Sequence, residues 1–308
     1  MATFEKLVLV TRQTRLAELL ERLPTKGRAK FYLKQQNLDF DDYEDEDDAY
    51  RRAVDQVQSA LHGTLKVQLL DRALLPTFLF SEKDVVVALG QDGLVANAAK
   101  YVGAQPLIGV NPDPRRFDGV LLPFPVAQAR GAVERVLAGR AAVRQVTLAE
   151  ARLRDGQRLL AFNDLYVGAQ SHVSARYHLR APHGDERQSS SGVIVSTGAG
   201  STGWLSSVFN MASNVSRFLG NAEAQPLRLQ WEDPRLVWVV REPFISRHST
   251  AQYTAGYLEP GGSLSLESLM PQGGVIFGDG MEKDFLGFNS GAVAEIRAAE
   301  TRARLVSA

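Results

Sequence analysis

The sequence predicts an α/β plus β fold: an N-terminal α/β domain with a mostly parallel sheet, followed by a C-terminal β-rich domain. Its 308 residues exceed the roughly 250 to 300 residues at which one hydrophobic core stops growing. Four short, β-branched apolar runs lie in the first half, separated by segments that are long enough for helices. After about residue 145, strand-like runs follow one another with turn residues between them. We therefore expect domains at residues 1–145 and 146–308.

The apolar runs of the first domain have the composition of buried parallel strands, which are covered on both faces. They are LVLVT at 7–11, KVQLLD at 66–71, DVVVALG at 84–90 and PLIGVN at 106–111. Residues 126–140 have apolar spacing near three and four and end close to Gly139, which predicts a helix. The acidic run at 39–48 is typical of a solvated loop or a helix start, and a metal or basic-partner site is the less favoured alternative.

The second domain is expected to contain one helix among many strands. Its strand-like runs are LLAFNDLYV, SARYHLRA, GVIVST, RLVWVV, AQYTAGYL, SLSLES, GGVIF and AVAEIRA. The helix is expected at 204–219, directly after a glycine-rich segment.

Composition excludes several classes of function. The 35 basic and 35 acidic residues cancel, so no global field attracts the chain to nucleic acid or to an anionic membrane, and neither partner is predicted. The absence of cysteine excludes disulfides, thiolate metal sites and a cysteine nucleophile. No stretch approaches the roughly 18 apolar residues of a membrane span. The N-terminal apolar run is interrupted by charges and does not resemble a signal peptide. We expect a soluble, cytoplasmic protein.

The first candidate motif is Gly90-Gln91-Asp92-Gly93, between an apolar strand and a plausible helix. Ligands of open α/β sheets bind where strand ends and helix N-termini converge, so Asp92 is placed for a functional role. A tight turn in which Asp92 only caps the helix would leave the same pattern.

The second candidate motif is the glycine-rich segment 196–203, STGAGSTG, which follows a strand and precedes the predicted helix. Glycines allow close approach of the backbone to a phosphate, and a helix N-terminus offers N–H groups to an anion. Residues 198–203 also match G-x-G-x-x-G. A Rossmann unit would require an acidic residue about 20 positions further on, at the end of a second parallel strand, and the β-rich surroundings do not supply it. A Gly/Ser surface loop is the alternative.

The third candidate motif is Phe162-Asn163-Asp164-Leu165, where an amide and a carboxylate interrupt an apolar run. Adjacent strand residues point to opposite faces, so one of the two could face a ligand unless the strand ends there, and a turn explains them equally well. The five histidines show no metal-ligand spacing.

Six segments, taken in order, form a longer pattern. They are GQDG at 90–93, FNDLYVG at 162–168, SSGVIVSTGAGSTGW at 190–204, REPF at 241–244, VIFGDG at 275–280 and FNSGA at 288–292. This pattern resembles the NAD kinase family, most closely its mitochondrial-type branch. The resemblance implies an α/β domain, a C-terminal β-sandwich and a nucleotide site in the cleft between them. It also implies ATP, NAD and Mg²⁺ as ligands, and a homodimer or larger homo-oligomer.

The resemblance implies residue roles. Asp92 matches the catalytic aspartate of the family's GGDG motif, beside the ribose 2′-hydroxyl that receives the phosphoryl group. Asn163 and Asp164 stand where the family has Asn-Glu, contacting the ribose and nicotinamide side of NAD. The other implied nucleotide-binding positions are Gly90, Gln91, Gly93, Thr197, Gly198, Gly200, Ser201, Thr202, Ser207 and Asp279. No protein ligand to a metal is implied, and Mg²⁺ would carry the phosphate charge.

The sequence departs from the family pattern where GGDGT is replaced by GQDGL. Gln91 adds a side chain and disfavours a positive φ, so we expect it to narrow the donor site, and Leu94 lacks the hydroxyl of threonine. The predicted activity is ATP-dependent phosphorylation of the adenosine ribose 2′-hydroxyl of NAD to give NADP. The alternatives are a non-catalytic dinucleotide sensor of the same fold, a related kinase for a lipid or sugar hydroxyl, and a Rossmann oxidoreductase.

Overall fold

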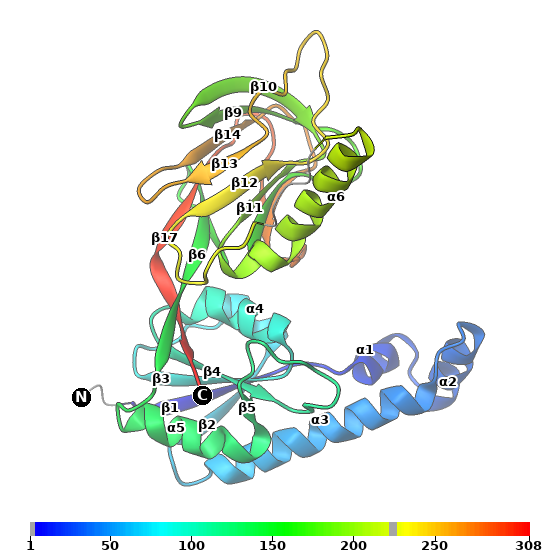
Figure 1. Cartoon of the computed structure of the whole chain (residues 1–308). Helices are drawn as coiled ribbons and strands as arrows, with labels where there is room; N and C mark the ends of the chain where they lie inside the picture. The colour runs from blue at the N-terminus through cyan, green and yellow to red at the C-terminus, as the bar shows by residue number, and fades with distance from the viewer. Residues whose placement is uncertain (1–3, 222–226) are drawn as a thin grey trace. The chain divides into compact units, whose positions relative to one another are not determined.

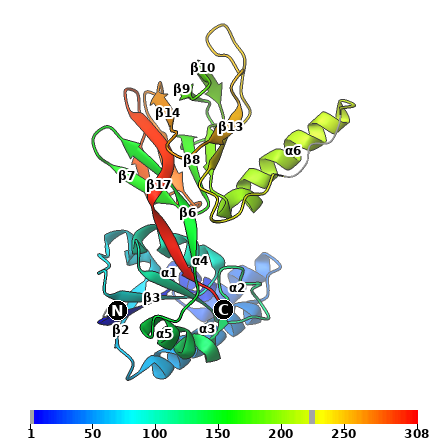
Figure 2. The ribbon, with the colours of Figure 1, turned by 60° about the vertical axis from the view of Figure 1, so that its left-hand side comes forward.

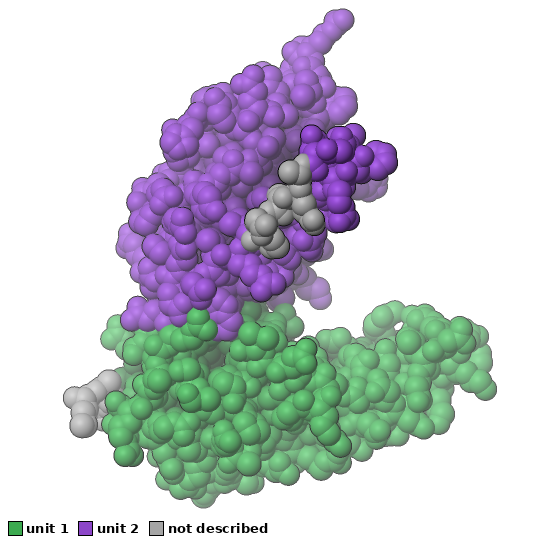
Figure 3. All heavy atoms as spheres, in the orientation of Figure 1, with its two compact units in different colours: residues 1–144, 304–308 green, residues 145–303 purple. Residues whose placement is uncertain are grey.

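The computed structural model describes residues 4–221 and 227–308, and the chain divides into two compact units (Figures 1 and 3). Unit 1 is residues 1–144 with 304–308, and unit 2 is residues 145–303. The predicted second domain included residues 304–308, but the end of the last strand pairs with a strand of unit 1. The predicted fold class is confirmed, because a mostly parallel sheet is accompanied by antiparallel sheet.

Unit 1 is built on parallel strands. Four of them coincide with the predicted apolar runs to within one residue at each end. The strands are β1 (Lys6–Thr11), β2 (Lys66–Asp71), β3 (Asp84–Leu89), β4 (Pro106–Asn111) and β5 (Phe124–Pro125). The helices are α1 (Arg15–Arg22), α2 (Lys26–Gln35), α3 (Phe40–Leu61), α4 (Asp92–Val102) and α5 (Ala129–Leu137), with 3₁₀ turns η1 (Arg72–Thr77) and η2 (Val126–Gln128). The strand order is β2-β1-β3-β4, and β4 also pairs with β5 and with the end of β17.

Both faces of the unit 1 sheet are covered (Figure 1). Helices α3 and α5 pack on one face, with Val57 and Val133 against strand residues such as Val87. Helix α4 covers the other face. All six residues of β3 and of β4 are buried, which explains why these strands show no alternation of apolar and polar residues.

The acidic run at 39–48 begins a helix, one of the two outcomes expected for it. Asp39 caps α3 by accepting a hydrogen bond from the Asp41 N–H. Two acidic residues of the run, Glu46 and Asp47, are buried and paired with arginines. The run therefore contributes to the packing of α1 against α3 as well as to the solvated surface.

Unit 2 is a β-sandwich with one long helix. Its strands are β6 (Val143–Leu153), β7 (Arg158–Ala161), β8 (Asp164–Ala169), β9 (Ala175–Ala181), β10 (Gly184–Ser190), β11 (Val193–Ser196), β12 (Leu236–Val240), β13 (Ala255–Leu258), β14 (Leu264–Ser268), β15 (Gly274–Gly278), β16 (Phe285–Gly287) and β17 (Val293–Val306). The 3₁₀ turn η3 (Ala199–Thr202) and helix α6 (Trp204–Phe218) follow β11.

Two sheets enclose the core of unit 2. One has the order β13-β12-β11-β8-β15-β16 and is antiparallel throughout. The other contains β10, β9, β14, β17, β6 and β7. Apolar side chains of alternate strand residues from both sheets meet in one cluster that includes Leu165, Val195, Tyr177 and Leu266. The opposite face of β8, β11 and β15 carries the candidate residues of this unit.

Helix α6 packs on that opposite face through its first half only. Leu205 is buried against Ile194, Val237 and Val239. The second half extends away from the strands of unit 2 (Figure 2). Among residues 4–221 and 227–308, no helix combines the length and the apolar character that crossing a membrane requires.

Candidate functional site

In unit 1, the carboxyl ends of β1 and β3 are tied together by Tyr50 of α3. Its hydroxyl donates to the Leu89 carbonyl at 2.8 Å and accepts from the Arg12 N–H at 2.9 Å. Burial raises the pKa of Tyr50 to about 12, so the phenol keeps its proton and can do both. This bridge fixes the backbone directly before the GQDG motif.

The GQDG motif forms the start of α4. Gln91 is the N-cap residue, with φ −109° and ψ 166°, and its exposed side chain makes no capping hydrogen bond. This is ordinary extended backbone, so the expected strain of a non-glycine residue is absent. Gly93 is exposed, with open space around it. The first N–H groups of α4 are therefore not covered by a capping side chain, as in sites where helix N-termini bind anions.

Asp92 is the first residue of α4 and is half-buried. Its Oδ1 accepts a hydrogen bond from the Leu121 N–H at 2.7 Å. Leu121 belongs to a loop that passes closely over β4, because a Cβ on Gly109 would lie 2.0 Å from the Leu121 carbonyl oxygen. One oxygen of Asp92 is thus fixed by the loop, and Oδ2 has no hydrogen-bond partner among the described residues.

Leu94 occupies the space beside Gly90. It is 1% exposed, and a Cβ on Gly90 would lie 2.8 Å from Leu94 Cδ2. A side chain at position 90 would therefore have to displace the end of the Leu94 side chain. The Arg12 side chain also lies next to Gly90, with Cδ 3.7 Å from the same Cβ position.

Arg12 belongs to a charged network beside the strand ends. It lies over the Tyr50 ring at 5.0 Å, and its guanidinium donates to Glu46 at 2.9 Å. Arg15 donates to the other oxygen of Glu46. Although burial acts in the opposite direction, these hydrogen bonds hold the pKa of Glu46 below its usual value. The network thus favours the carboxylate form of Glu46, which orients two arginines.

In unit 2, Phe162 and Asn163 form a turn between β7 and β8, and Asp164 begins β8. The Asp279 carboxylate accepts from the N–H groups of all three residues, at 3.0, 2.6 and 3.3 Å. On the carbonyl side, Thr197 Oγ1 donates to Phe162 at 2.6 Å and Thr197 N donates to Asn163 at 2.9 Å. The turn is therefore held from both sides.

Asn163 and Asp164 differ in exposure. The Asn163 side chain is partly exposed and its amide makes no hydrogen bond among the described residues. Asp164 is only 7% exposed. Burial, and then the neighbouring charge of Asp279, raise the pKa of Asp164 to about 7. A buried carboxyl that changes protonation near neutrality is a frequent feature of functional sites.

The glycines of the segment 196–203 allow close packing of the chain on itself. A Cβ on Gly198 would lie 1.8 Å from the Gln230 carbonyl oxygen, and one on Gly200 would lie 2.1 Å from that of Asn163. Thr197 and Ser201 are buried, and the Ser201 hydroxyl donates to Gly198 at 2.7 Å. Strand β11 has antiparallel neighbours, so no Rossmann βαβ unit is formed.

Two further hydroxyls of this region are exposed, and its aromatic rings line a pocket. Thr202 and Ser207 are exposed at the start of α6, although Ser207 Oγ donates weakly to Gly203 at 3.5 Å. Trp204 stacks on Tyr166 with ring centroids 5.7 Å apart, and Arg241 lies 5.2 Å from the Trp204 ring. These rings line a pocket of about 310 Å³ whose wall also includes Phe277, Val275, Gln170 and Glu282.

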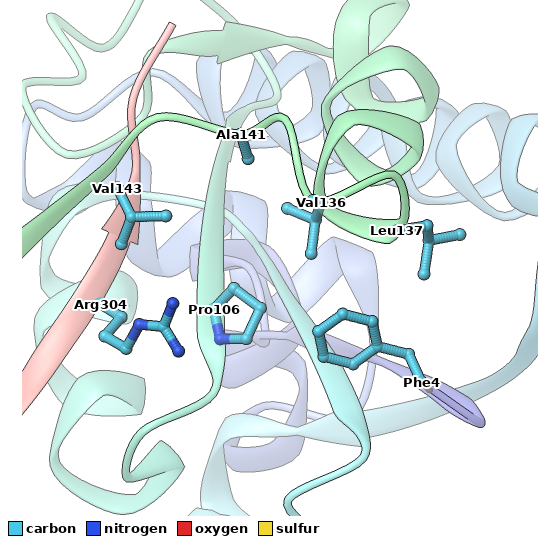
Figure 4. A pocket seen from close by; sticks show the side chains of 8 residues that line it. Phe4, Pro106, Val136, Leu137, Ala141, Val143 and Arg304 are labelled. Atoms are coloured by element: carbon cyan, nitrogen blue, oxygen red, sulfur yellow. The ribbon is translucent and has the colours of Figure 1, made fainter. Parts of the chain in front are cut away.

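A second pocket, of about 230 Å³, lies in unit 1 at the amino ends of the parallel strands (Figure 4). Its walls are mostly apolar, with Phe4, Pro106 and Val136 around a single charged side chain, Arg304. Pro106 is the first residue of β4, whereas Asp92 follows the last residue of β3. Ligands of open α/β sheets bind at the carboxyl ends of strands, so this pocket is not the candidate site.

The structure thus assembles two groups of predicted residues, one in each unit. Asp92 with its loop belongs to unit 1, and Asn163, Asp164, Thr197 and Asp279 come together in unit 2. Sequence reasoning did not find the roles of Tyr50, Arg12 and the Tyr166–Trp204 pair. Tyr166 and Trp204 both lie within the quoted motifs, and that position was the available signal.

The combination of these two units is a fold that solved structures share. The structure of yeast NADH kinase complexed with NADH is similar with a TM-score of 0.60 and 15% identity, covering 99% of this chain and 84% of that chain. The structure of an NAD kinase from Archaeoglobus fulgidus in complex with ATP is similar with a TM-score of 0.55 and 15% identity, covering 98% and 93%. No protein-family model and no curated protein matches the sequence. The chain therefore has the NAD kinase fold.

Proposed function

We propose that this protein is an NAD kinase-like phosphotransferase, which transfers the γ-phosphoryl group of ATP to the adenosine ribose 2′-hydroxyl of NAD and forms NADP. The observation that carries the proposal is the placement of Asp92. It starts α4 at the end of a central parallel strand, with one carboxylate oxygen fixed and the other available, in a chain that has the NAD kinase fold.

Asp92 is proposed as the general base. Its Oδ1 is held by the Leu121 N–H, which fixes the plane of the carboxylate. Oδ2 accepts the proton of the 2′-hydroxyl as the ribose oxygen attacks the γ-phosphorus. The bond from the γ-phosphorus to the β,γ-bridging oxygen breaks, ADP leaves, and the proton passes to solvent. The N-terminus of α4 favours the phosphate charge nearby.

The acceptor nucleotide is proposed to bind to unit 2. Asn163 offers a free amide, Asp164 a carboxyl group, and Thr202 and Ser207 exposed hydroxyls. The pocket lined by Tyr166 and Trp204 is suited to a flat ring, because aromatic faces stack on bases. These groups support binding of an adenine dinucleotide.

Mg²⁺ enters the proposal bound to the phosphates of ATP, where it neutralises the charge of the transferred group. No group of three or more His, Cys, Asp or Glu side chains suited to a metal ion is present in the described parts of the chain. The protein's contribution is to position the donor and acceptor.

The proposal includes a homodimer. The second half of α6 exposes Met211, Val215 and Phe218, and Phe218 is 87% exposed. Residues at this spacing share one helix face, and a second copy of the chain would cover it. Sedimentation velocity of the purified protein measures the oligomeric state, and a monomer over the micromolar range would contradict this part of the proposal.

A binding protein without transfer is the second candidate, and Leu94 favours it. Leucine stands where the family pattern has a threonine, and its buried side chain fills the space beside Gly90. Such a protein would bind NAD and leave ATP unchanged.

The deciding assay incubates the purified protein with NAD, ATP and Mg²⁺ and detects NADP with an enzyme that accepts only NADP. We expect NADP to form, and we expect Asp92→Asn to lower turnover by about 10² to 10⁴-fold with little change in NAD affinity. NAD binding without NADP formation would establish the sensor. A protein that binds no NAD at millimolar concentration would refute both.

A further inference from the structure

The turn at Phe162–Asp164 has every backbone polar group bonded within unit 2. Its three N–H groups donate to the Asp279 carboxylate. The carbonyls of Phe162 and Asn163 accept from Thr197, and the carbonyl of Asp164 accepts from the Asp279 N–H at 2.9 Å. Two residues from distant parts of the sequence therefore hold three consecutive peptide units.

The end of β15 gives Asp279 the backbone conformation that this contact uses. The strand ends at Gly278, which pairs with Leu165 of β8, and Asp279 then adopts the left-handed conformation with φ 56°. Few non-glycine residues adopt this conformation, and aspartate is among the more tolerant. Oδ1 accepts two of the N–H groups and Oδ2 the third, so both oxygens are engaged with the turn.

Thr197 completes the opposite side. It is fully buried, and its hydroxyl also accepts from the Gly200 N–H at 3.2 Å. Gly200 in turn lies so close to the Asn163 carbonyl oxygen that a Cβ there would be 2.1 Å away. The turn has no room to shift toward the glycine-rich segment.

We propose that Asp279 and Thr197 are positioning residues, which hold the Phe162–Asp164 turn rigid so that the Asn163 amide and the Asp164 carboxyl are already in place when the acceptor nucleotide binds. They act through the turn rather than through contact with the nucleotide, which differs from the direct contact implied by family resemblance. The identity of the nucleotide rests on the proposed function, whereas the rigidity of the turn does not. Preorganised groups bind and react better because their ordering cost is already met during folding.

The electrostatics of the turn agree with this role. Three N–H donors stabilise the charge of Asp279, and that charge favours the neutral form of the buried Asp164. A neutral Asp164 reduces repulsion between the site and the phosphates of a dinucleotide. Asp279 thus fixes the geometry of the turn and, together with burial, favours the neutral form of Asp164.

The test compares Asp279→Asn, Thr197→Val and the control Asp155→Asn. Asparagine has the size of aspartate, but its amide nitrogen cannot accept from a backbone N–H. Asp155→Asn removes the same charge from unit 2 at an exposed turn where the carboxylate accepts hydrogen bonds from Gln157. Hydrogen exchange of peptides covering residues 160–167 is measured by mass spectrometry without ligand, and NAD affinity by calorimetry.

For Asp279→Asn we expect exchange of the 162–164 amides to accelerate at least about tenfold and the Kd for NAD to rise about tenfold, with the KM for ATP unchanged. Thr197→Val should shift both quantities in the same direction by a smaller factor, and Asp155→Asn should shift neither. If Asp279→Asn loses protection in β9 and β10 as well, it is unfolded and Thr197→Val decides.

Unchanged exchange at 162–164 in the folded variants would overturn the inference. Faster exchange with unchanged NAD affinity would also overturn the inference, because the rigidity of the turn would then not contribute to NAD binding. A wild-type protein that binds no NAD while Asp279→Asn still loosens the turn would refute the proposed function and leave the rigid turn established.

Discussion

Replacing Asp164 by asparagine should change how the stability of unit 2 depends on pH. Burial and the charge of Asp279 raise the pKa of Asp164 from 3.8 to about 7 in the folded protein. The folded state therefore binds this proton more tightly than the unfolded state does. Between about pH 4 and 7 the folded state carries more protons than the unfolded state. The free energy of unfolding therefore falls as the pH rises through this window, and it levels off above pH 7.

The size of the effect follows from the two pKa values. At about 1.4 kcal/mol for each pKa unit, the difference amounts to an upper limit of about 4 kcal/mol above pH 7. Asp164→Asn keeps the shape of the side chain and carries no charge, so the variant does not lose this stability as the pH rises. The variant should become more stable than the wild type as the pH rises from 4 to 8, with the difference growing by a few kcal/mol.

The assay is urea unfolding followed by tryptophan fluorescence. All three tryptophans, Trp204, Trp231 and Trp238, lie in unit 2, so the signal reports this unit alone. Asp155→Asn is the control, because hydrogen bonds from Gln157 lower the pKa of Asp155 and give a pH effect of opposite sign. Unfolding free energies of wild type and Asp164→Asn that change in parallel with pH would refute the reasoning. A wild type that becomes more stable relative to the variant at high pH would refute it as well.

Three further predictions concern the glycine-rich segment and the GQDG motif. Gly200→Ala should weaken NAD binding at least tenfold in calorimetry, because its Cβ would lie 2.1 Å from the Asn163 carbonyl oxygen, and unchanged affinity would contradict the close packing. Leu94→Thr should cost about 2 to 4 kcal/mol in unfolding free energy and lower the KM for ATP, since it opens buried space beside Gly90 and adds a hydroxyl. Gln91→Gly should leave that KM within about twofold, because Gln91 already has ordinary extended backbone.

The sequence predicted well the features that depend on local pattern. The buried strands β1 to β4 appear where β-branched runs predicted them, and α6 differs from its predicted range by one residue. Hydrophobic periodicity determines such elements. The return of β17 to β4 was not predicted, because the pairing of Arg304 with Pro106 joins residues nearly 200 positions apart and leaves no local signal.

The candidate motifs lie at strand ends, turns and a helix start in the structure, while the contacts of their side chains were not visible in the sequence. The sequence does not show whether a glycine leaves room for a phosphate or for another part of the chain. In the structure, Gly198 leaves room for the Gln230 carbonyl and Gly200 leaves room for the Asn163 carbonyl. Similarly, nothing near Glu46 in the sequence indicates that Arg12, 34 residues away, pairs with it.

The arrangement around Asp164 explains why two acidic residues can share one small region of unit 2. A buried carboxylate is costly unless hydrogen bonds and neighbouring charges compensate it. Asp279 accepts hydrogen bonds from three backbone N–H groups, so the negative charge is more stable on Asp279 than on Asp164, whose carboxyl accepts no hydrogen bond from the described residues. With a pKa of about 7, Asp164 is about half protonated at pH 7, and its protonated form can donate a hydrogen bond while Asp279 acts as an acceptor for the backbone. A ribose hydroxyl can accept such a hydrogen bond, whereas a dinucleotide phosphate approaching two charged carboxylates would be repelled. Burial, together with the Asp279 charge that the backbone hydrogen bonds of the turn stabilise, therefore favours protonation of Asp164 when an anionic nucleotide arrives.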